Sequence, residues 1–254
     1  MGKIVAFANQ KGGVAKTITS WTTAAGLKRR GYKVLAIDLD PQGNLATCTG
    51  VEKENIPTVF HVMKGEVKIQ EAIQKLDVFD LLPSNMLLSG ADAEFDSMKR
   101  KEYLIKDALI EVKDEYDYII LDTPPALGIL TINAFTCADE IIIPAFASEL
   151  SLEGIMYLYE AIEAVQKLSN PDLKIRGIVF TRYMSRSVIH KELKNLTKQI
   201  TDYIGVPIFK SYIRSAVGVE TAVTNKKDLY SYDKNSKISK DYERFIDEYL
   251  KGEG

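Results

Sequence analysis

Short apolar runs recur along the chain, and segments with helical or polar patterns separate them. The runs cover residues 4–8, 34–37, 78–82, 118–121, 140–143 and 175–180. An apolar run of this length is typical of a strand that is buried on both faces of a parallel sheet. The alternation predicts an α/β fold with three layers, in which helices cover both faces of a mostly parallel, twisted sheet.

The clearest helical pattern lies before the last of these runs. We predict that it begins after Ser151, a suitable N-cap residue, and that the Asn-Pro-Asp sequence at residues 170–172 ends it. One stripe of this helix carries four apolar residues, Ile155, Leu158, Ile162 and Val165. No repeat, linker or low-complexity segment interrupts the chain, so we expect one domain over residues 1–254.

Composition narrows the class of protein further. Apolar residues make up 46% and charged residues 27% of the chain, which argues against disorder. No apolar stretch approaches the roughly 20 residues that span a bilayer, and residues 1–3 leave no room for a signal peptide before the first strand. Cys48, Cys137, His61 and His190 lack metal-ligand spacing, so we interpret them as structural. A reducing cytoplasm fits these features.

The most informative segment is a glycine-rich turn between the first strand and a helical segment that ends near Arg30. Residues 9–18, which we call the phosphate loop, read NQKGGVAKTI. Such a turn presents backbone N–H groups at the positive end of a helix dipole, which suits a phosphate chain. Lys16 can reach the terminal phosphates of a nucleotide, and the Thr17 hydroxyl can hold Mg²⁺. A second lysine, Lys11, stands at the start of the glycine turn.

Carboxylates follow two of the other predicted strands. Asp38 and Asp40 come at the end of the second run, and four apolar residues precede Asp122 in the fourth. If the extended geometry continues, Asp38 and Asp40 point the same way. Ligands of parallel α/β sheets bind at the carboxyl ends of the strands, so we expect these acids to act on Mg²⁺, its waters or an attacking water.

Charge is distributed unevenly, although the net charge is only −2. Residues 92–163 carry 16 acidic against 5 basic residues, whereas residues 171–240 carry 14 basic against 6 acidic residues. A basic segment of this kind suits a surface that meets a polyanion. Solvated helix faces are the alternative, and the pattern alone leaves both open.

Three motifs in this order resemble the deviant Walker ATPases of the ParA/Soj family, which partition plasmids or chromosomes. The motifs are residues 11–17 (KGGVAKT), 38–44 (DLDPQGN) and 122–125 (DTPP), and residues 213–222 agree with them. The likeness extends over essentially the whole chain. It implies a P-loop NTPase with a deviant Walker A motif that binds ATP and Mg²⁺.

The resemblance assigns roles to single residues. Lys16 holds the β- and γ-phosphates, and Lys11 reaches across a dimer interface to the partner's nucleotide. Asp40 positions or activates the hydrolytic water. The implied catalytic residues are Lys11, Lys16, Asp38 and Asp40, and the implied magnesium residues are Thr17, Asp38 and Asp122. The implied nucleotide-binding residues are Lys11, Gly12, Gly13, Val14, Ala15, Lys16, Thr17 and Ile18.

Two positions of the phosphate loop depart from the family pattern, and Gly218 stands where many members of the family have a basic residue. Ala15 stands where glycine is common, and its methyl group is strained if the loop needs a positive φ there. Ile18 replaces a threonine whose hydroxyl could contact the α-phosphate. We therefore expect ATP binding to survive, while these two departures leave the rate of hydrolysis open. The resemblance by itself implies slow intrinsic hydrolysis that a partner stimulates.

The resemblance also implies partners. An ATP-sandwiched homodimer would bind double-stranded DNA without sequence preference, associate with the nucleoid and respond to a ParB-like centromere-binding adaptor. The candidate DNA residues are Arg186, Lys191, Lys194, Arg214, Lys226 and Lys227. No helix-turn-helix precedes the phosphate loop, which implies the small type of the family, and no membrane partner is expected.

Four other interpretations stay open. A MinD-like positioning ATPase would bind a membrane through its C-terminal helix, but the tail at residues 241–250 is acidic and its apolar side chains suit docking on the body. An iron protein of the nitrogenase type would need paired cysteines, and Cys48 is misplaced for that. A tyrosine kinase with a deviant Walker loop would use the tyrosines near the C-terminus. A DNA-coating protein without hydrolysis would result if Ala15 abolishes turnover.

Overall fold

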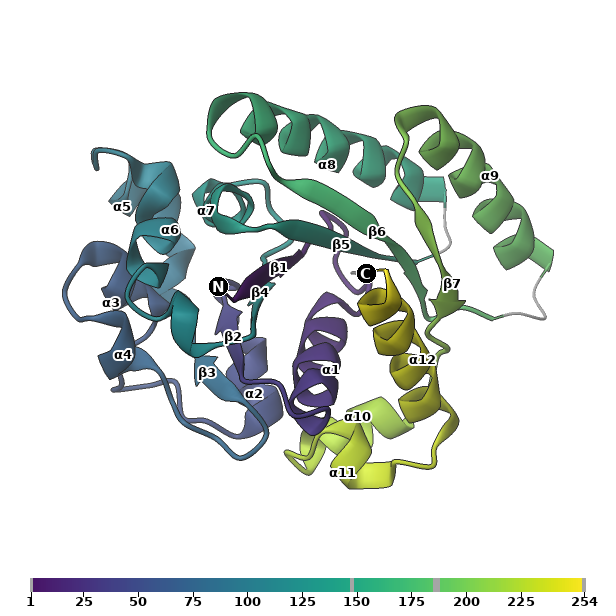
Figure 1. The fold of residues 1–254 in the computed structure, drawn as a ribbon, viewed down its shortest axis with the longest axis horizontal. Coiled ribbons are helices and arrows are strands. Elements are labelled where there is room, and N and C mark those ends of the chain that lie inside the picture. The colour runs from purple at the N-terminus through teal and green to yellow at the C-terminus, as the bar shows by residue number, and fades with distance from the viewer. Residues whose placement is uncertain (1, 147–148, 185–187, 253–254) are drawn as a thin grey trace.

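The computed structural model describes residues 2–146, 149–184 and 188–252, and its centre is one seven-stranded sheet (Figure 1). The strand order is β3-β2-β4-β1-β5-β6-β7, and every paired strand runs parallel to its neighbour. The strands are β1 (Lys3–Phe7), β2 (Val34–Asp38), β3 (Asp80–Leu82), β4 (Tyr118–Asp122), β5 (Glu140–Phe146), β6 (Lys174–Thr181) and β7 (Ile208–Tyr212).

Six strands lie where the apolar runs predict them, with ends that shift by a few residues. β3 is shorter than predicted, and β5 continues three residues further. The sequence pattern missed β7, which is an edge strand with only one fully buried residue, Phe209. A half-exposed edge strand lacks the continuous apolar run by which the other strands are recognised.

Helices fill the connections between the strands. They are α1 (Lys16–Arg29), α2 (Asn44–Thr49), α3 (Val59–Lys64), α4 (Ile69–Ala72), α5 (Ala91–Glu94), α6 (Leu104–Leu109), α7 (Ile129–Cys137), α8 (Glu149–Leu168), α9 (Val188–Ile204), α10 (Gly218–Thr224), α11 (Leu229–Asp233) and α12 (Lys237–Lys251). Three short 3₁₀ turns are η1 (Met86–Gly90), η2 (Lys101–Tyr103) and η3 (Lys113–Glu115).

Helix α8 confirms the predicted apolar stripe and corrects the predicted start. Ile155, Leu158, Ile162 and Val165 are all at most 3% exposed. The N-cap prediction for Ser151 is wrong, because the helix already begins at Glu149. The helix dipole favours an acidic residue type in the first turn, so a helix that begins at a glutamate competes with one that begins after the later serine.

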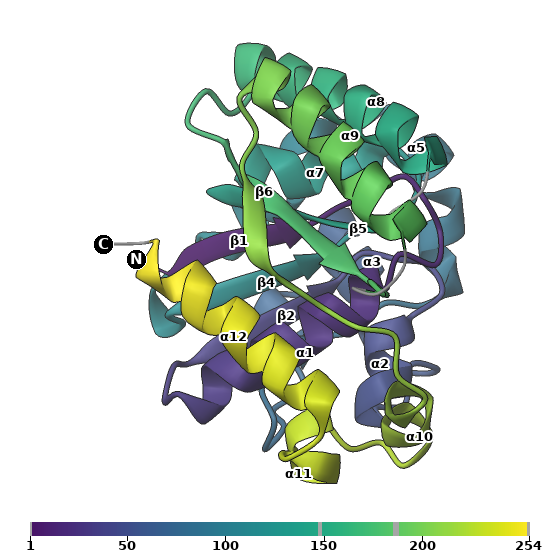
Figure 2. The same ribbon diagram turned by 90° about the vertical axis from the view of Figure 1, so that its right-hand side faces the viewer.

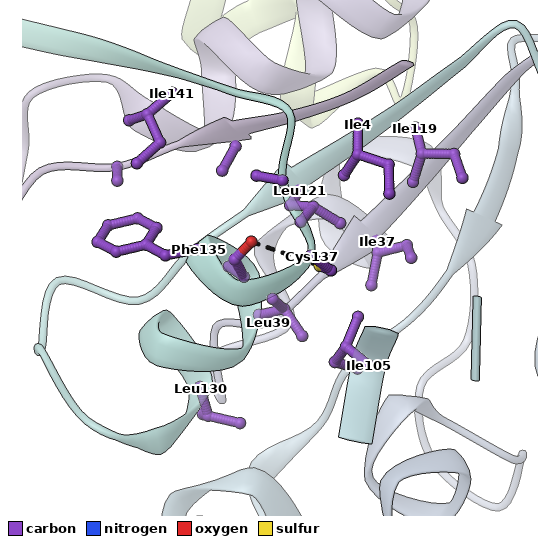
Figure 3. Close-up of a cluster of buried hydrophobic side chains, with 14 of the residues drawn as sticks. Ile4, Ile37, Leu39, Ile105, Ile119, Leu121, Leu130, Phe135, Cys137 and Ile141 are labelled. Carbon is purple, nitrogen blue, oxygen red and sulfur yellow. Dashed lines mark hydrogen bonds between the residues drawn. The ribbon is translucent and has the colours of Figure 1, made fainter. Parts of the chain in front are cut away.

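The central strands bury alternate residues against two separate layers of helices. Ile4 and Ala6 belong to a core cluster with residues of α3, α4, α6, α7 and α8, part of which Figure 3 shows. Val5 and Phe7 belong to the opposite cluster with residues of α1, α2, α10, α11 and α12. Figures 1 and 2 show the same two layers on either side of the sheet. The predicted three-layer α/β fold is therefore confirmed.

The C-terminal helix α12 packs on α1 and β7. Its apolar residues Tyr242, Phe245, Ile246 and Tyr249 are each fully buried, as predicted. The apolar face that a membrane-binding tail would need is thus already covered by the protein. Over the residues that the structure describes, no helix is both long and apolar enough to cross a membrane.

The residues interpreted as structural have structural partners where they are described. His61 accepts a hydrogen bond at Nδ1 from the backbone N–H of Thr58 (3.1 Å) and so caps α3. Cys48 and Cys137 are buried free thiols, and burial raises the pKa of each to about 12. The side chain of His190 lies outside the described residues.

Candidate functional site

The phosphate loop crosses the carboxyl edge of the sheet, between β1 and α1. Gly13 has φ +74°, and Ala15 has φ +59° and ψ +32°, so both adopt the left-handed conformation. The condition under which the methyl group of Ala15 is strained, a positive φ at this position, is therefore met. A Cβ atom added at Gly12 or Gly13 would meet nothing within 4 Å, so open space lies beside the loop.

The end of β6 holds the loop from below. Thr181 Oγ1 donates to the carbonyl oxygen of Val14 (2.8 Å), and a guanidinium nitrogen of Arg182 donates to that of Gly13 (3.3 Å). Arg182 is itself left-handed, with φ +51°. Sequence reasoning gave Thr181 and Arg182 no role in holding the loop; their position at the carboxyl end of a predicted strand was the available signal.

Asn9 fixes the start of the loop. Its buried side chain donates from Nδ2 to the carbonyl oxygen of Pro144 at 2.7 Å. Its Oδ1 accepts the backbone N–H of Lys11 at 2.9 Å. Asn9 therefore ties the backbone of Lys11 to β5, and sequence reasoning missed this role as well. The Lys11 side chain is half-buried.

Lys16 begins α1 and is buried, with only 8% of its surface exposed. Burial lowers the pKa of Lys16, while the nearby carboxylates of Asp122, Asp40 and Asp38 oppose that shift. The structure thus brings this lysine and all three predicted acids into one electrostatic cluster. A buried ammonium group favours a further anionic ligand, because the anion replaces the water that the charge has lost.

Asp38 and Asp122 occupy facing positions at the carboxyl ends of β2 and β4. Both are fully buried. Burial raises the pKa of Asp122 to about 6, and Lys16 opposes that rise. The nearby hydroxyls of Thr17 and Ser20 also lower the pKa of Asp122. Among the described residues, however, none makes a hydrogen bond of ordinary geometry to either oxygen of Asp122.

Asp38 is used differently from Asp122. Its two oxygens accept the backbone N–H groups of Asp40 (3.0 Å) and Leu45 (2.9 Å). Burial, then the charge of Asp122, raises the pKa of Asp38 well above its usual range. The extended backbone on which Asp38 and Asp40 would point the same way does not continue: β2 ends at Asp38, the chain turns, and Asp40 Oδ1 accepts the N–H of Gln42 at 2.9 Å. The Asp38 carboxylate thereby satisfies one of the first N–H groups of α2, that of Leu45.

The arrangement fits Mg²⁺ bound together with a phosphate chain. Within the described residues, no group of three or more His, Cys, Asp or Glu side chains is placed to hold a metal alone. Mg²⁺ commonly takes one or two protein oxygens and completes its shell with phosphates and waters. The Thr17 hydroxyl and the unpartnered, buried oxygens of Asp122 offer that kind of donor set beside the loop.

A pocket of about 510 Å³ opens beside the loop, and we call it the side pocket. Its walls come from Gly13, Ala15 and Ile18 on one side and from the segment after β7, α10 and α12 on the other. The apolar residues that line it are Ala15, Ile18, Ile213, Ala216, Val219, Val223, Ile238 and Tyr242. Ile18 therefore contributes an apolar wall. The pocket has the size and lining that suit a flat aromatic ring with a polar edge.

The predicted DNA residues are only partly described. Arg186 lies outside the described residues, and Lys191 and Lys194 lie on α9 with side chains outside them. Lys226 and Lys227 follow α10 and are exposed.

Arg214 differs from the other described candidates because its side chain has a buried partner. Its guanidinium donates from Nε (2.5 Å) and from NH2 (2.9 Å) to the buried carboxylate of Asp241. A guanidinium committed to a buried partner is not available as a primary phosphate contact, because leaving the partner would strand a buried charge.

Comparisons with known proteins agree with this geometry. The family described as "AAA domain" matches residues 2–175. The chain is 36% identical to the chromosome-partitioning ATPase Soj of Treponema pallidum, over 100% of this chain and 99% of the relative. It is also 36% identical to the sporulation initiation inhibitor protein Soj of Bacillus subtilis, over 95% of this chain and 96% of the relative.

Solved structures are similar along the whole chain. A putative plasmid partition protein of Borrelia burgdorferi bound to AMPPNP has a TM-score of 0.84 at 29% identity, covering 99% of this chain and 100% of that one. A structure described as cobyrinic acid a,c-diamide synthase of Mycobacterium smegmatis, with an ATP analog and magnesium, has a TM-score of 0.88 at 33% identity, covering 99% and 95%.

Proposed function

The chain belongs to the ParA/Soj family of partition ATPases, and from that membership we propose that two copies of it enclose two ATP molecules and bind DNA as a dimer. Its nucleotide is ATP and its metal is Mg²⁺. We propose that residues 1–254 act as a single ATPase domain. A ParB-like adaptor would stimulate hydrolysis and release the subunits from the nucleoid, so that cargo moves toward DNA that is still coated.

One observation supports the dimer above all. Five large apolar side chains are exposed at the carboxyl edge of the sheet, each shortly after a strand: Met86 (56%), Leu87 (49%), Leu127 (36%), Met184 (54%) and Val217 (80%). They follow β3, β4, β6 and β7 and so lie at the same edge of the sheet as the phosphate loop. Exposed apolar groups gathered around a polar site are typical of a protein interface.

Electrostatics makes ATP a suitable adhesive in this interface. A triphosphate buried between two subunits would oppose association unless positive groups compensated its charge. Lys16 supplies one such group from below, and in the proposed dimer Lys11 supplies another from the partner. Loss of the γ-phosphate removes part of the anion that both lysines share, so the dimer weakens on hydrolysis.

Each loop residue then has a defined task. The backbone of Gly12, Gly13, Val14 and Ala15 cradles the phosphates, and Ile18 lines the side pocket, which would take the base. Thr17 and Asp122 would hold Mg²⁺, which neutralises charge that develops on the transferred phosphoryl group. Asp38 shapes the turn that presents Asp40, and Asp40 would orient the attacking water.

DNA is the partner that best suits the basic segment at residues 171–240. Contacts from lysine and arginine to phosphates are independent of sequence and weaken steeply with salt. Lys226 and Lys227 remain the described candidates, with Lys191, Lys194 and Arg186 as candidates from sequence. We propose a cytoplasmic, nucleoid-associated location on this basis.

Sedimentation of the protein with plasmid DNA tests the proposal. ATP with Mg²⁺ should bring the protein down with DNA, whereas ADP or no nucleotide should not. Raising salt from about 50 to 200 mM should release it. Sedimentation that is equal in all three nucleotide states would refute the ATP-dependent dimer. Flotation with anionic liposomes, if observed instead, would favour the MinD-like alternative.

A further inference from the structure

The carboxylate of Asp241, on α12, is buried and takes no part in the site described so far. It is 1% exposed. It accepts hydrogen bonds from the backbone N–H of Arg214 (3.2 Å), from two guanidinium nitrogens of the same residue, and from the guanidinium of Arg244. Burying a carboxylate is costly unless it is paired this fully, so its position in the fold is tightly determined.

Asp241 fixes one wall of the side pocket from behind. Arg214 belongs to the segment after β7, which lines the pocket through Ile213, Arg214, Ser215 and Ala216. The sheet holds the start of this segment, because the N–H of Ile213 donates to Phe180 at 2.7 Å. Beyond Ile213, the bidentate contact of Arg214 with Asp241 restrains the backbone.

The next residue of α12 reaches the opposite wall. The hydroxyl of Tyr242 lies 3.2 Å from Thr19 Oγ1. The Thr19 hydroxyl in turn donates to the carbonyl oxygen of Ala15 at 2.7 Å. Ala15 is the left-handed residue of the phosphate loop and also lines the side pocket. Two consecutive residues of α12 therefore contact both sides of the same pocket.

We propose that Asp241 is a positioning residue for the nucleotide base: it sets the distance between the segment after β7 and the phosphate loop, so that the side pocket fits a purine ring. This inference rests on the proposed ATP site. Asp241 touches no nucleotide itself and acts through Arg214. Loss of the Asp241 carboxylate should therefore reduce the contribution of the base to the affinity for ATP and leave the contribution of the phosphates unchanged.

A pair of ligands separates these two parts. ATP uses both the phosphate loop and the side pocket, whereas inorganic tripolyphosphate has no base and uses the loop alone. In Asp241→Asn the ion pair becomes a weaker contact between the charged guanidinium and a neutral amide, which we expect to raise the Kd of ATP about tenfold. The Kd of tripolyphosphate should change less than about twofold. Both are measured by calorimetry with Mg²⁺ on the full chain.

The same helix provides a matched control. Asp247 also pairs with an arginine, Arg30 at 2.5 Å, but its side chain is 55% exposed and it does not line the side pocket. Asp247→Asn should bind both ligands as the unmodified protein does. If Asp241→Asn does not fold, Arg214→Lys tests the same contact, because lysine keeps the charge but cannot make the two parallel hydrogen bonds.

Two results would overturn the inference. One is an equal loss of ATP and tripolyphosphate binding, which indicates general damage to the site. The other is unchanged ATP affinity in a folded Asp241→Asn or Arg214→Lys protein. In either case the proposed function stands as long as the unmodified protein binds ATP. If the unmodified protein binds neither ligand, the proposed ATP site itself is wrong.

Discussion

Ala15 stores conformational strain in the phosphate loop, and replacing it with glycine should stabilise the protein. Its φ of +59° and ψ of +32° lie in the left-handed region. That conformation costs a residue with a Cβ atom about 1–2 kcal/mol. Glycine releases this strain but makes the unfolded chain more flexible, which costs back about 0.4–1 kcal/mol. With the middle of each range, the net gain in the free energy of unfolding is about 0.8 kcal/mol.

A change of this size is measurable in a chain of 254 residues. A gain of 1 kcal/mol corresponds to a Tm shift of roughly 2–4 °C at this size, so we expect a rise of about 1–4 °C for Ala15→Gly. The melting is followed by circular dichroism without nucleotide, because bound ligand would add its own stabilisation.

The same substitution at Ala24, inside the helix that follows the loop, should have the opposite sign. Ala24 lies inside α1 and is fully buried. Glycine there costs about 1 kcal/mol in helix propensity and about 0.8 kcal/mol for the lost methyl group. If Ala15→Gly melts at or below the temperature of the unmodified protein while Ala24→Gly is destabilised, the assigned strain is not present in the molecule.

Three further variants test the site. Lys11→Ala should still bind ATP but sediment as a monomer in analytical ultracentrifugation with ATP, and an ATP-dependent dimer of this variant would contradict the shared-lysine interface. Asp122→Asn should lose the rise in Tm that Mg²⁺ adds to ATP in the unmodified protein, because it removes the negative charge and one of the two buried oxygens proposed to face the metal; an undiminished Mg²⁺ effect would place the metal elsewhere. Replacing Lys226 and Lys227 together with alanine should weaken DNA binding at every sequence. It should also reduce the magnitude of the negative slope of log Kobs against log salt by about 2. An unchanged slope in a filter-binding titration would remove both lysines from the DNA surface.

Local sequence was sufficient for the sheet centre and for the main elements of the site. The buried strands are continuous apolar runs, which few other structures tolerate, and the glycines of the phosphate loop are read directly from the chain. Even the left-handed conformation at Ala15 was predictable, because the resemblance placed a glycine-favoured position there. Asp38 and Asp122 lie opposite each other because the parallel strands that carry them end at the same edge of the sheet.

Other features depend on contacts between segments that are far apart in the chain. Arg214 was a reasonable DNA candidate by sequence, yet Asp241, 27 residues later, occupies its guanidinium. Thr181 and Asn9 hold the loop through partners more than 130 residues away. No periodicity or motif carries such pairings, because they arise only when the strands are ordered in the sheet.

The chain by itself determined which residues can meet a phosphate: lysines, a threonine and glycines placed at a strand-to-helix turn, where backbone N–H groups are unavoidably free. Only the folded molecule decided how the acids divide their work. The two oxygens of Asp38 accept backbone N–H groups of the turn that follows. The two oxygens of Asp122 are buried without a hydrogen-bond partner in the described part of the protein. The two residues have the same chemistry and similar positions at strand ends, and they differ because hydrogen bonding is set by the neighbours that tertiary packing supplies.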